Sequence, residues 1–160
     1  MSKAQSALER FEKNVGNEEG VGEWFQVDQE RINGFADATL DHQFIHVDPE
    51  KSAKLSPYKV TIAHGFLTLS LLPHLGSKIP PVDPQAYDGL VMGVNYGLDK
   101  VRFPAPVKVD ARIRARRSLA SVEQKAPNAL QLKQVVTMEI EGEDKPACVA
   151  ESLTRLIYAD

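Results

Sequence analysis

Residues 62–75 most constrain how this chain can fold, because their spacing predicts a helix that is apolar on nearly all sides. Apolar side chains fill the segment except at His64, Gly65, Thr68, Ser70, Pro73 and His74. A helix in contact with water keeps a polar face, so a helix of this kind has to be covered all round. Gly76 and the prolines at 80–81 end it. The rest of the chain is therefore expected to wrap around this helix.

Long strands in the second half of the chain can supply that cover. Residues 107–116 alternate apolar with charged side chains, and residues 130–140 alternate apolar with polar ones, as strands with one buried face do. Residues 89–103 are predicted to form another strand. Residues 147–158 read as the last one, and a short turn joins it to its predecessor in an antiparallel pair. We therefore expect an α+β fold in which an antiparallel sheet wraps around a long central apolar helix.

The charged side of the first alternating strand carries Arg112, Arg114 and Arg116. A charged outer face of a strand is usually solvated, and this is the interpretation we favour. The alternative is a contact with a phosphate or pyrophosphate group of a substrate, which a guanidinium group binds through paired hydrogen bonds.

The first half of the chain reads as short helices joined by loops, with turn residues between the periodic segments. An aspartate before a helical pattern predicts an N-cap, and proline is favoured in a first helical turn. In order, we expect a helix at residues 3–14, a loop at 14–22, a strand at 23–27, a helix from an N-cap at Asp28 to about Thr39, an irregular stretch at 40–49 and a short helix from Pro49.

Composition excludes several classes of protein. The 160 residues, 42% hydrophobic and 26% charged, predict one globular domain over residues 1–160, with a short helical extension at about 1–20. A net charge of -3 offers no broad basic surface for nucleic acid. The only cysteine is Cys148, which excludes an intrachain disulfide, and no Cys/His cluster has zinc-site spacing. Without a signal-like or membrane-spanning apolar run, we expect a cytoplasmic protein that does not bind membranes.

A carboxylate and an imidazole, Asp41 and His46, lie in the irregular stretch after the predicted helix. Adding water to a double bond conjugated with a carbonyl needs a base for the water and an acid for the α-carbon. Short polar side chains on an irregular segment can converge on a pocket, where one holds the water while the other exchanges its proton. The alternative is structural: a capping aspartate and a histidine satisfied in the core.

The second chemical motif, His64-Gly65, stands at the expected start of the apolar helix. First-turn N–H groups lack intrahelical partners, and glycine lets a ligand approach the backbone closely. The enolate formed during hydration needs such donors at its oxygen, and one can be worth ~3 kcal/mol. For His64 the structural alternative is a helix cap or a hydrogen bond in the core.

These two motifs in tandem resemble the MaoC-like dehydratase family, which includes the (R)-specific enoyl-CoA hydratases. Asp41 and His46, followed by His64-Gly65 at a helix start, match the motif order of the family. The segment at residues 95–107 is similar to the strand and turn that follow this helix, and it is closest to the nodulation-protein-N-like branch. The resemblance covers roughly residues 20–158.

The resemblance implies a hot-dog fold and a homodimer with one sheet continuous across the interface. It implies (R)-specific hydration of trans-2-enoyl-CoA thioesters, or the reverse dehydration, with Asp41 and His46 activating water and the N–H of Gly65 receiving the thioester oxygen. His64 and Gln43 are further candidates for binding the substrate. Neither a metal nor a cofactor is expected, because the thioester of CoA or of acyl carrier protein is itself the substrate.

The sequence departs from the hydratase motif between its two catalytic positions, where Asn-Pro is common and Gln43 and Phe44 stand here. Gln43 can still form hydrogen bonds with a longer reach, whereas Phe44 replaces a rigid turn residue with bulk. These changes bear on the substrate more than on the acid–base pair. The alternatives are an acyl-CoA thioesterase, since one fold hosts several chemistries, and a non-catalytic acyl-thioester-binding module.

Overall fold

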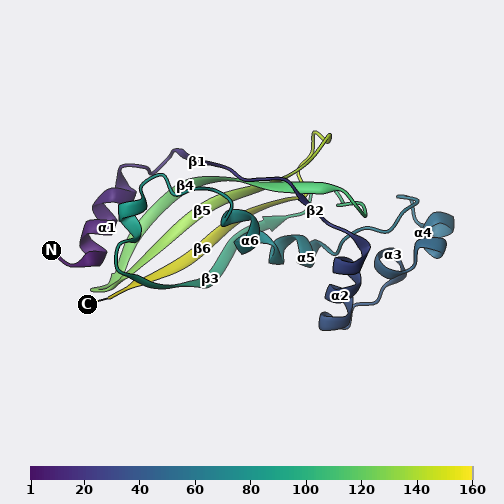
Figure 1. Cartoon of the computed structure of the whole chain (residues 1–160), viewed down its shortest axis with the longest axis horizontal. Coiled ribbons are helices and arrows are strands. Elements are labelled where there is room, and N and C mark those ends of the chain that lie inside the picture. The colour runs from purple at the N-terminus through teal and green to yellow at the C-terminus, as the bar shows by residue number, and fades with distance from the viewer. Residues whose placement is uncertain (160) are drawn as a thin grey trace.

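The computed structural model describes residues 1–159. Figure 1 shows the order of its elements along the chain. The helices are α1 (Lys3–Glu12), α2 (Gln29–Thr39), α3 (Phe44–Val47), α4 (Pro49–Leu55), α5 (Gly65–Ser70), α6 (Leu72–Gly76) and the 3-10 helix η1 (Pro84–Tyr87). The strands are β1 (Glu18–Val21), β2 (Phe25–Gln26), β3 (Leu90–Arg102), β4 (Arg112–Ala126), β5 (Ala129–Ile140) and β6 (Cys148–Tyr158).

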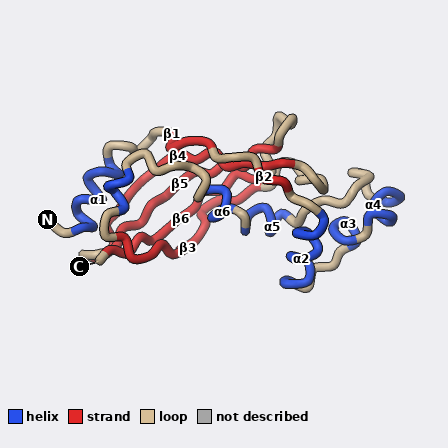
Figure 2. The backbone as a smooth tube through the Cα atoms, viewed as in Figure 1, coloured by secondary structure: helices blue, strands red, loops and turns tan. Residues whose placement is uncertain are grey.

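The strands form one antiparallel sheet of six strands, in the order β1-β4-β5-β6-β3, with β2 also paired to β4. The turn between β5 and β6 gives the hairpin that the sequence predicts. Side chains of β5 alternate between buried and half-buried from Leu130 to Ile140, so the predicted period-two pattern is confirmed. The predicted α+β class, with apolar helices packed on an antiparallel sheet, is also confirmed, and Figure 2 shows α6 against the sheet.

The predicted central helix is divided into α5 and α6, which meet at Leu71. Proline lacks an N–H group and its ring clashes with the carbonyl four residues earlier, so Pro73 interrupts the helix. Leu67, Leu71 and Leu75 recur at helical spacing and pack into the main core against the sheet. The opposite side of α5 is not covered within this chain, since Phe66 is 69% exposed. The expectation of a helix covered on all sides is therefore wrong for a single chain.

The predicted helices α2 and α4 are confirmed, including the N-cap at Asp28, whose side chain accepts a hydrogen bond from the N–H of Arg31. Three local predictions are wrong. The expected loop at 14–22 contains β1, which pairs with β4. The stretch at 40–49 contains the short helix α3. The strand expected from residue 107 begins at Arg112, because a turn with Asp110 at φ 67 precedes it.

Helix α1 and the group α2–α4 lie at opposite ends of the sheet (Figure 1). Near the chain termini, α1 covers a second core through Ala4, Ala7 and Phe11, which pack with strand residues such as Leu130 and Tyr158. At the other end, α2, α3 and α4 extend beyond the sheet edge, next to the start of α5. Among the described residues no helix is both long and apolar enough to cross a membrane.

The arginines on the outer face of β4 are paired with carboxylates. Arg112 bonds Glu141, and Arg114 and Arg116 both bond Glu139. Their strand neighbours Ile113 and Ala115 are fully buried in the core, so the arginines occupy the opposite face of the sheet. The solvated, ion-paired interpretation therefore fits these residues.

Candidate active site

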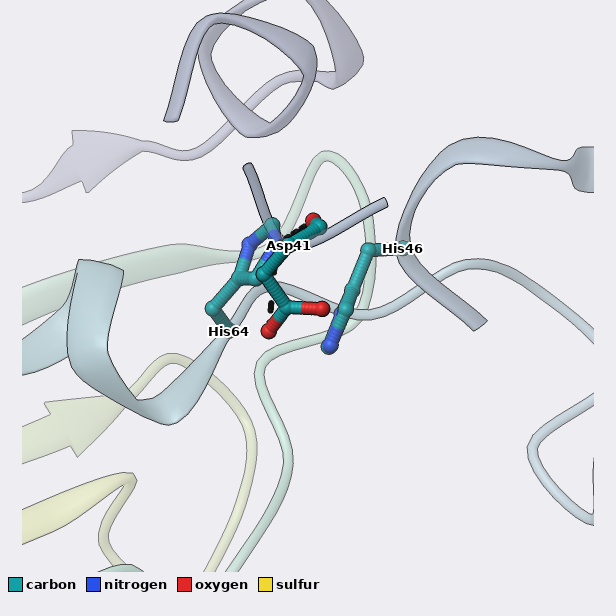
Figure 3. Close-up of side chains that lie close together, drawn as sticks. All are labelled: Asp41, His46 and His64. Atoms are coloured by element: carbon teal, nitrogen blue, oxygen red, sulfur yellow. Dashed lines mark hydrogen bonds and ion pairs between the residues drawn. The ribbon is translucent and has the colours of Figure 1, made fainter. Parts of the chain in front are cut away.

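The end of α2 directs the chain towards the start of α5. Leu40 ends α2 in the left-handed conformation, with φ 64, although a leucine disfavours it. Asp41 follows immediately, His46 lies on the one-turn helix α3, and His64 is the residue before α5. Figure 3 shows these three side chains together, with the Asp41 carboxylate next to the His46 ring. The structure therefore brings the two predicted motifs to one place.

The orientation of His46 is fixed by the main chain. Its Nδ1 lies 2.7 Å from the carbonyl oxygen of Ile62, and its own carbonyl oxygen accepts a hydrogen bond from the Gln29 side chain at 2.7 Å. A carbonyl only accepts hydrogen bonds, so Nδ1 carries the hydrogen and Nε2 keeps its lone pair. Burial lowers the pKa of His46 and nearby His64 lowers it further, while the Ile62 bond and the Asp41 charge act in the opposite direction. Nε2 is thus a neutral base near pH 7.

Asp41 is the exposed member of the group, with 53% of its side chain in contact with solvent. Its Oδ1 accepts a hydrogen bond from the backbone N–H of Gln43 at 3.3 Å, which holds the carboxylate in a local turn. Gln43 itself is exposed and precedes α3 without a side-chain cap bond. Phe44, the other unusual residue, forms the first turn of α3 where the family has a turn proline. Asp41 therefore offers a solvated carboxylate beside a buried imidazole.

His64 lies behind this pair rather than at the surface, since only 3% of it is exposed. Its Nε2 is 2.9 Å from the backbone carbonyl oxygen of Asp41, and its ring stacks on His46 with centroids 3.8 Å apart. Phe35 of α2 packs against the same ring. Among the described residues, Nδ1 of His64 has no hydrogen-bond partner.

A cavity of about 310 Å³ opens beside His46. Its wall includes Gly65 and Thr68 of α5, and Phe103 and Ala147 on the sheet side. A larger hollow of about 430 Å³ lies between α5–α6 and β3, but of its lining residues only Tyr96 is titratable. We place the chemistry in the smaller cavity, because it contains an imidazole and the first backbone N–H groups of α5.

Asp41, His46 and His64 offer ligand atoms within 4.8 Å of one another, which raises the question of a metal. The two imidazole rings are stacked at only 22° to each other, so their in-plane lone pairs do not converge on a point. In addition, Nε2 of His64 is occupied by the carbonyl of Asp41. A zinc ion needs ligands directed at it from ~2.0–2.1 Å, and these residues would have to rearrange to do so. The absence of a metal stays a prediction.

Sequence reasoning missed two contributors to the site. Gln29, in the first turn of α2, joins the His46 backbone to the hydroxyl of Thr61, which donates to its side-chain oxygen. Phe103 lies so close to Gly65 that a methyl group there would be 3.2 Å from its ring. A signal for Phe103 existed, since it falls within the segment that resembles the family, whereas nothing local marks Gln29.

Comparisons with known proteins show which family the chain resembles. The family model described as MaoC like domain matches residues 10–141. The 3-hydroxyacyl-thioester dehydratase Z of Mycobacterium tuberculosis strain H37Rv is 49% identical over 143 residues, which cover 89% of this chain and 91% of that protein. Nodulation protein N of Rhizobium leguminosarum bv. viciae is 49% identical over 141 residues, 88% of this chain and 84% of that protein.

Among solved structures, the (R)-hydratase of A. caviae involved in PHA biosynthesis superposes with a TM-score of 0.62. The match covers 84% of this chain and 94% of that chain. At 20% sequence identity, this likeness shows the shared hot-dog fold alone.

Proposed function

Because the chain belongs to the MaoC-like domain family, we propose that it is a hydro-lyase that adds water to trans-2-enoyl thioesters to form (R)-3-hydroxyacyl thioesters, or catalyses the reverse dehydration. One observation carries the proposal. The carboxylate of Asp41 lies next to the His46 ring, and His46 lines the cavity whose wall also includes Gly65. This set contains a base, a second polar group for the same water and a backbone donor.

In the proposed hydration, Asp41 accepts a hydrogen bond from a water molecule and His46 accepts its proton through Nε2. The water oxygen then forms a bond to the β-carbon, and the electrons of the double bond move towards the thioester carbonyl. The N–H of Gly65 donates to the resulting enolate oxygen. The proton on Nε2 is finally delivered to the α-carbon, which restores the carbonyl and the neutral imidazole.

The acyl thioester is the substrate in this scheme, so no further cofactor is required. We propose CoA or acyl carrier protein as the carrier of the acyl group, in keeping with the name of the mycobacterial relative, which acts on 3-hydroxyacyl thioesters. The cavity is bordered by exposed Phe103 and Tyr58, which can contact the apolar part of such a substrate. We further propose a cytoplasmic enzyme that binds neither nucleic acid nor membranes.

We propose a homodimer that forms through β3. This strand of 13 residues ends the sheet order, and exposed side chains occupy nearly all of it. Its exposed apolar side chains are Val91, Met92, Val94, Tyr96 and Leu98. A long apolar edge strand is unusual in a monomer, because its free backbone groups and side chains favour pairing with another strand. A second copy pairing there would also shield the uncovered side of α5, where Phe66 is exposed.

The activity is tested with purified protein and crotonyl-CoA or a longer enoyl-CoA, by following the loss of absorbance of the conjugated thioester. Asp41→Asn and His46→Ala should each lower kcat by ~10²–10⁴-fold, the range for a positioned acid–base group. Unchanged rates in both variants would remove the site assignment. Release of free thiol would instead indicate a thioesterase, and binding without turnover across chain lengths would indicate a binding module.

The dimer is tested separately by light scattering on the purified protein. Val94→Lys places a charge on β3, where Val94 is 45% exposed, and should convert the dimer to a monomer. The matched control is Val15→Lys, which lies at a similarly exposed position outside the sheet and should leave the mass unchanged. A monomeric wild-type protein would contradict the proposal.

A further inference from the structure

We propose that His64 is a positioning residue, which fixes Asp41 relative to His46 through the backbone instead of touching the substrate. The inference rests on the proposed function and deepens it at the same site. Its basis is the contact of one buried ring with both members of the catalytic pair: Nε2 of His64 is 2.9 Å from the Asp41 carbonyl oxygen, and the ring stacks on His46 at 3.8 Å.

The hydrogen bond anchors a segment whose side-chain contacts are otherwise local: Nε2 of His42 lies 2.8 Å from Oδ1 of Asp37, on the exposed side of α2. Asp41 follows Leu40, which is 82% exposed and in the left-handed conformation, and the residues from Asp41 to Gln43 belong to no helix or strand. The bond from the Gln43 N–H to the carboxylate is local and orients only the side chain. The bond from His64 joins the same residue to the buried start of α5, 23 positions along the chain. It therefore sets where the Asp41 backbone lies relative to the cavity.

The stacking contact connects the same ring to the base. His46 is only 6% exposed, and its ring lies nearly parallel to that of His64. Phe35 packs against His64 from α2, with ring centroids 4.9 Å apart. A displacement of His64 would consequently change the location of both the carboxylate and the imidazole, and a misplacement of ~1 Å can lower a rate by ~10²-fold.

A purely structural role for His64 does not explain two unfavourable features near Asp41, an unpaired buried nitrogen and a left-handed leucine. The buried Nδ1 of His64 has no hydrogen-bond partner among the described residues, although burying a polar atom without one is unfavourable. Leu40 also keeps a left-handed backbone next to the anchored residue. An apolar ring in place of His64 would remove the unpaired nitrogen. Unfavourable features such as these are typically retained at functional sites. What histidine provides here, and phenylalanine does not, is an N–H donor to Asp41 on an aromatic ring.

Two substitutions separate the donor from the ring. His64→Phe keeps an aromatic ring against His46 and removes the donor, whereas His64→Gln removes the ring and keeps an N–H that can reach the Asp41 carbonyl. With an enoyl-CoA substrate, His64→Phe should lower kcat by ~10–100-fold with KM changed by less than about threefold, because the carboxylate is misplaced while binding is retained. His64→Gln should recover most of kcat.

A double-mutant comparison tests whether His64 acts through Asp41. In the Asp41→Asn background, His64→Phe should cause little further loss, because the group that it positions is already inactive. Wild-type rates in His64→Phe would overturn the inference. Equal losses in the Phe and Gln variants, multiplied again in the Asp41→Asn background, would also overturn it, since a general packing defect behaves in this way.

A measurement on the wild-type protein tests the inference even if the variants do not fold or the proposed function is wrong. Nitrogen-15 NMR of the imidazoles should show hydrogen on Nε2 of His64 and on Nδ1 of His46, as the two carbonyl contacts require. Hydrogen on Nδ1 of His64 would overturn the inference whatever the activity. If no enoyl thioester is turned over, the proposed function fails, and the tautomer still decides whether the anchor exists.

Discussion

Replacing Gly65 by alanine should remove most of the activity while it changes the stability only slightly. A methyl group at this position would lie 3.2 Å from Cγ and Cδ2 of Phe103 and 3.3 Å from Cε2. Carbon atoms in contact prefer ~3.5–4.0 Å, so the ring has to move by a few tenths of an ångström. Phe103 is 41% exposed and packs edge-on against exposed Phe66, so it has room to turn away.

The two expected magnitudes differ enough to be separated. Excess volume in a packed core costs ~1–3 kcal/mol, and the yielding ring places Gly65→Ala at the lower end of this range. A loss of ~1 kcal/mol lowers Tm by ~2–4 °C in a chain of this size. If the N–H of Gly65 receives the enolate oxygen, a methyl group beside it obstructs the approach of the thioester, and the loss of one such donor costs ~10²-fold or more in kcat.

The assay is enoyl-CoA hydration well below the melting temperature of each variant, with thermal unfolding measured in parallel. Gly34→Ala is the matched control, because Gly34 is exposed on α2 and a methyl group there meets nothing within 4 Å. A Gly65→Ala/Phe103→Ala double variant relieves the contact with the ring but keeps the methyl group, so it should stay inactive. The reasoning is refuted if Gly65→Ala retains activity within about threefold of wild type, or if the double variant recovers it.

Three further outcomes follow from buried groups. Burial lowers the pKa of His46, so at pH values below its ordinary pKa of 6.5 the native state binds fewer protons than the unfolded state. The free energy of unfolding, measured with denaturant, should therefore fall as the pH decreases through 6.5 towards the native pKa. The fall should be smaller in His46→Gln. Glu19→Gln should cost ~3 kcal/mol in thermal unfolding, since it leaves the largely covered Arg117 side chain, 15% exposed, without its counter-charge, and Glu19→Leu/Arg117→Met should recover part of this loss. Burial raises the pKa of Cys148 to about 11, so a thiol reagent should react only after unfolding, and rapid reaction of the native protein would contradict its burial.

Features that depend on neighbours in sequence could be predicted well. The N-cap of α2 and the alternation of β5 follow from local hydrogen bonding and from the period of a strand. The break at Leu71 was not predicted, although it has a local cause, because Pro73 makes a continuous helix unfavourable. By contrast, β1 forms in a glycine-rich stretch because it pairs with β4, where Glu19 meets Arg117 across 98 positions of the chain. No local pattern contains that partner.

In the candidate site, too, some features follow from the local sequence and others depend on tertiary contacts. The sequence pattern predicted that Asp41, His46 and the His64-Gly65 motif form one site, but it did not predict which ring nitrogen of each histidine forms a hydrogen bond. Both rings donate to a main-chain carbonyl, His46 through Nδ1 and His64 through Nε2. In the proposed mechanism the remaining lone pair of His46 accepts a proton from a water molecule held by Asp41, whereas that of His64 is buried without a partner among the described residues. The two histidines therefore differ in which ring nitrogen carries the hydrogen and which one is left to act as a base. That difference is set by the carbonyl that each ring contacts, and the spacing of residues in the sequence does not reveal such tertiary contacts.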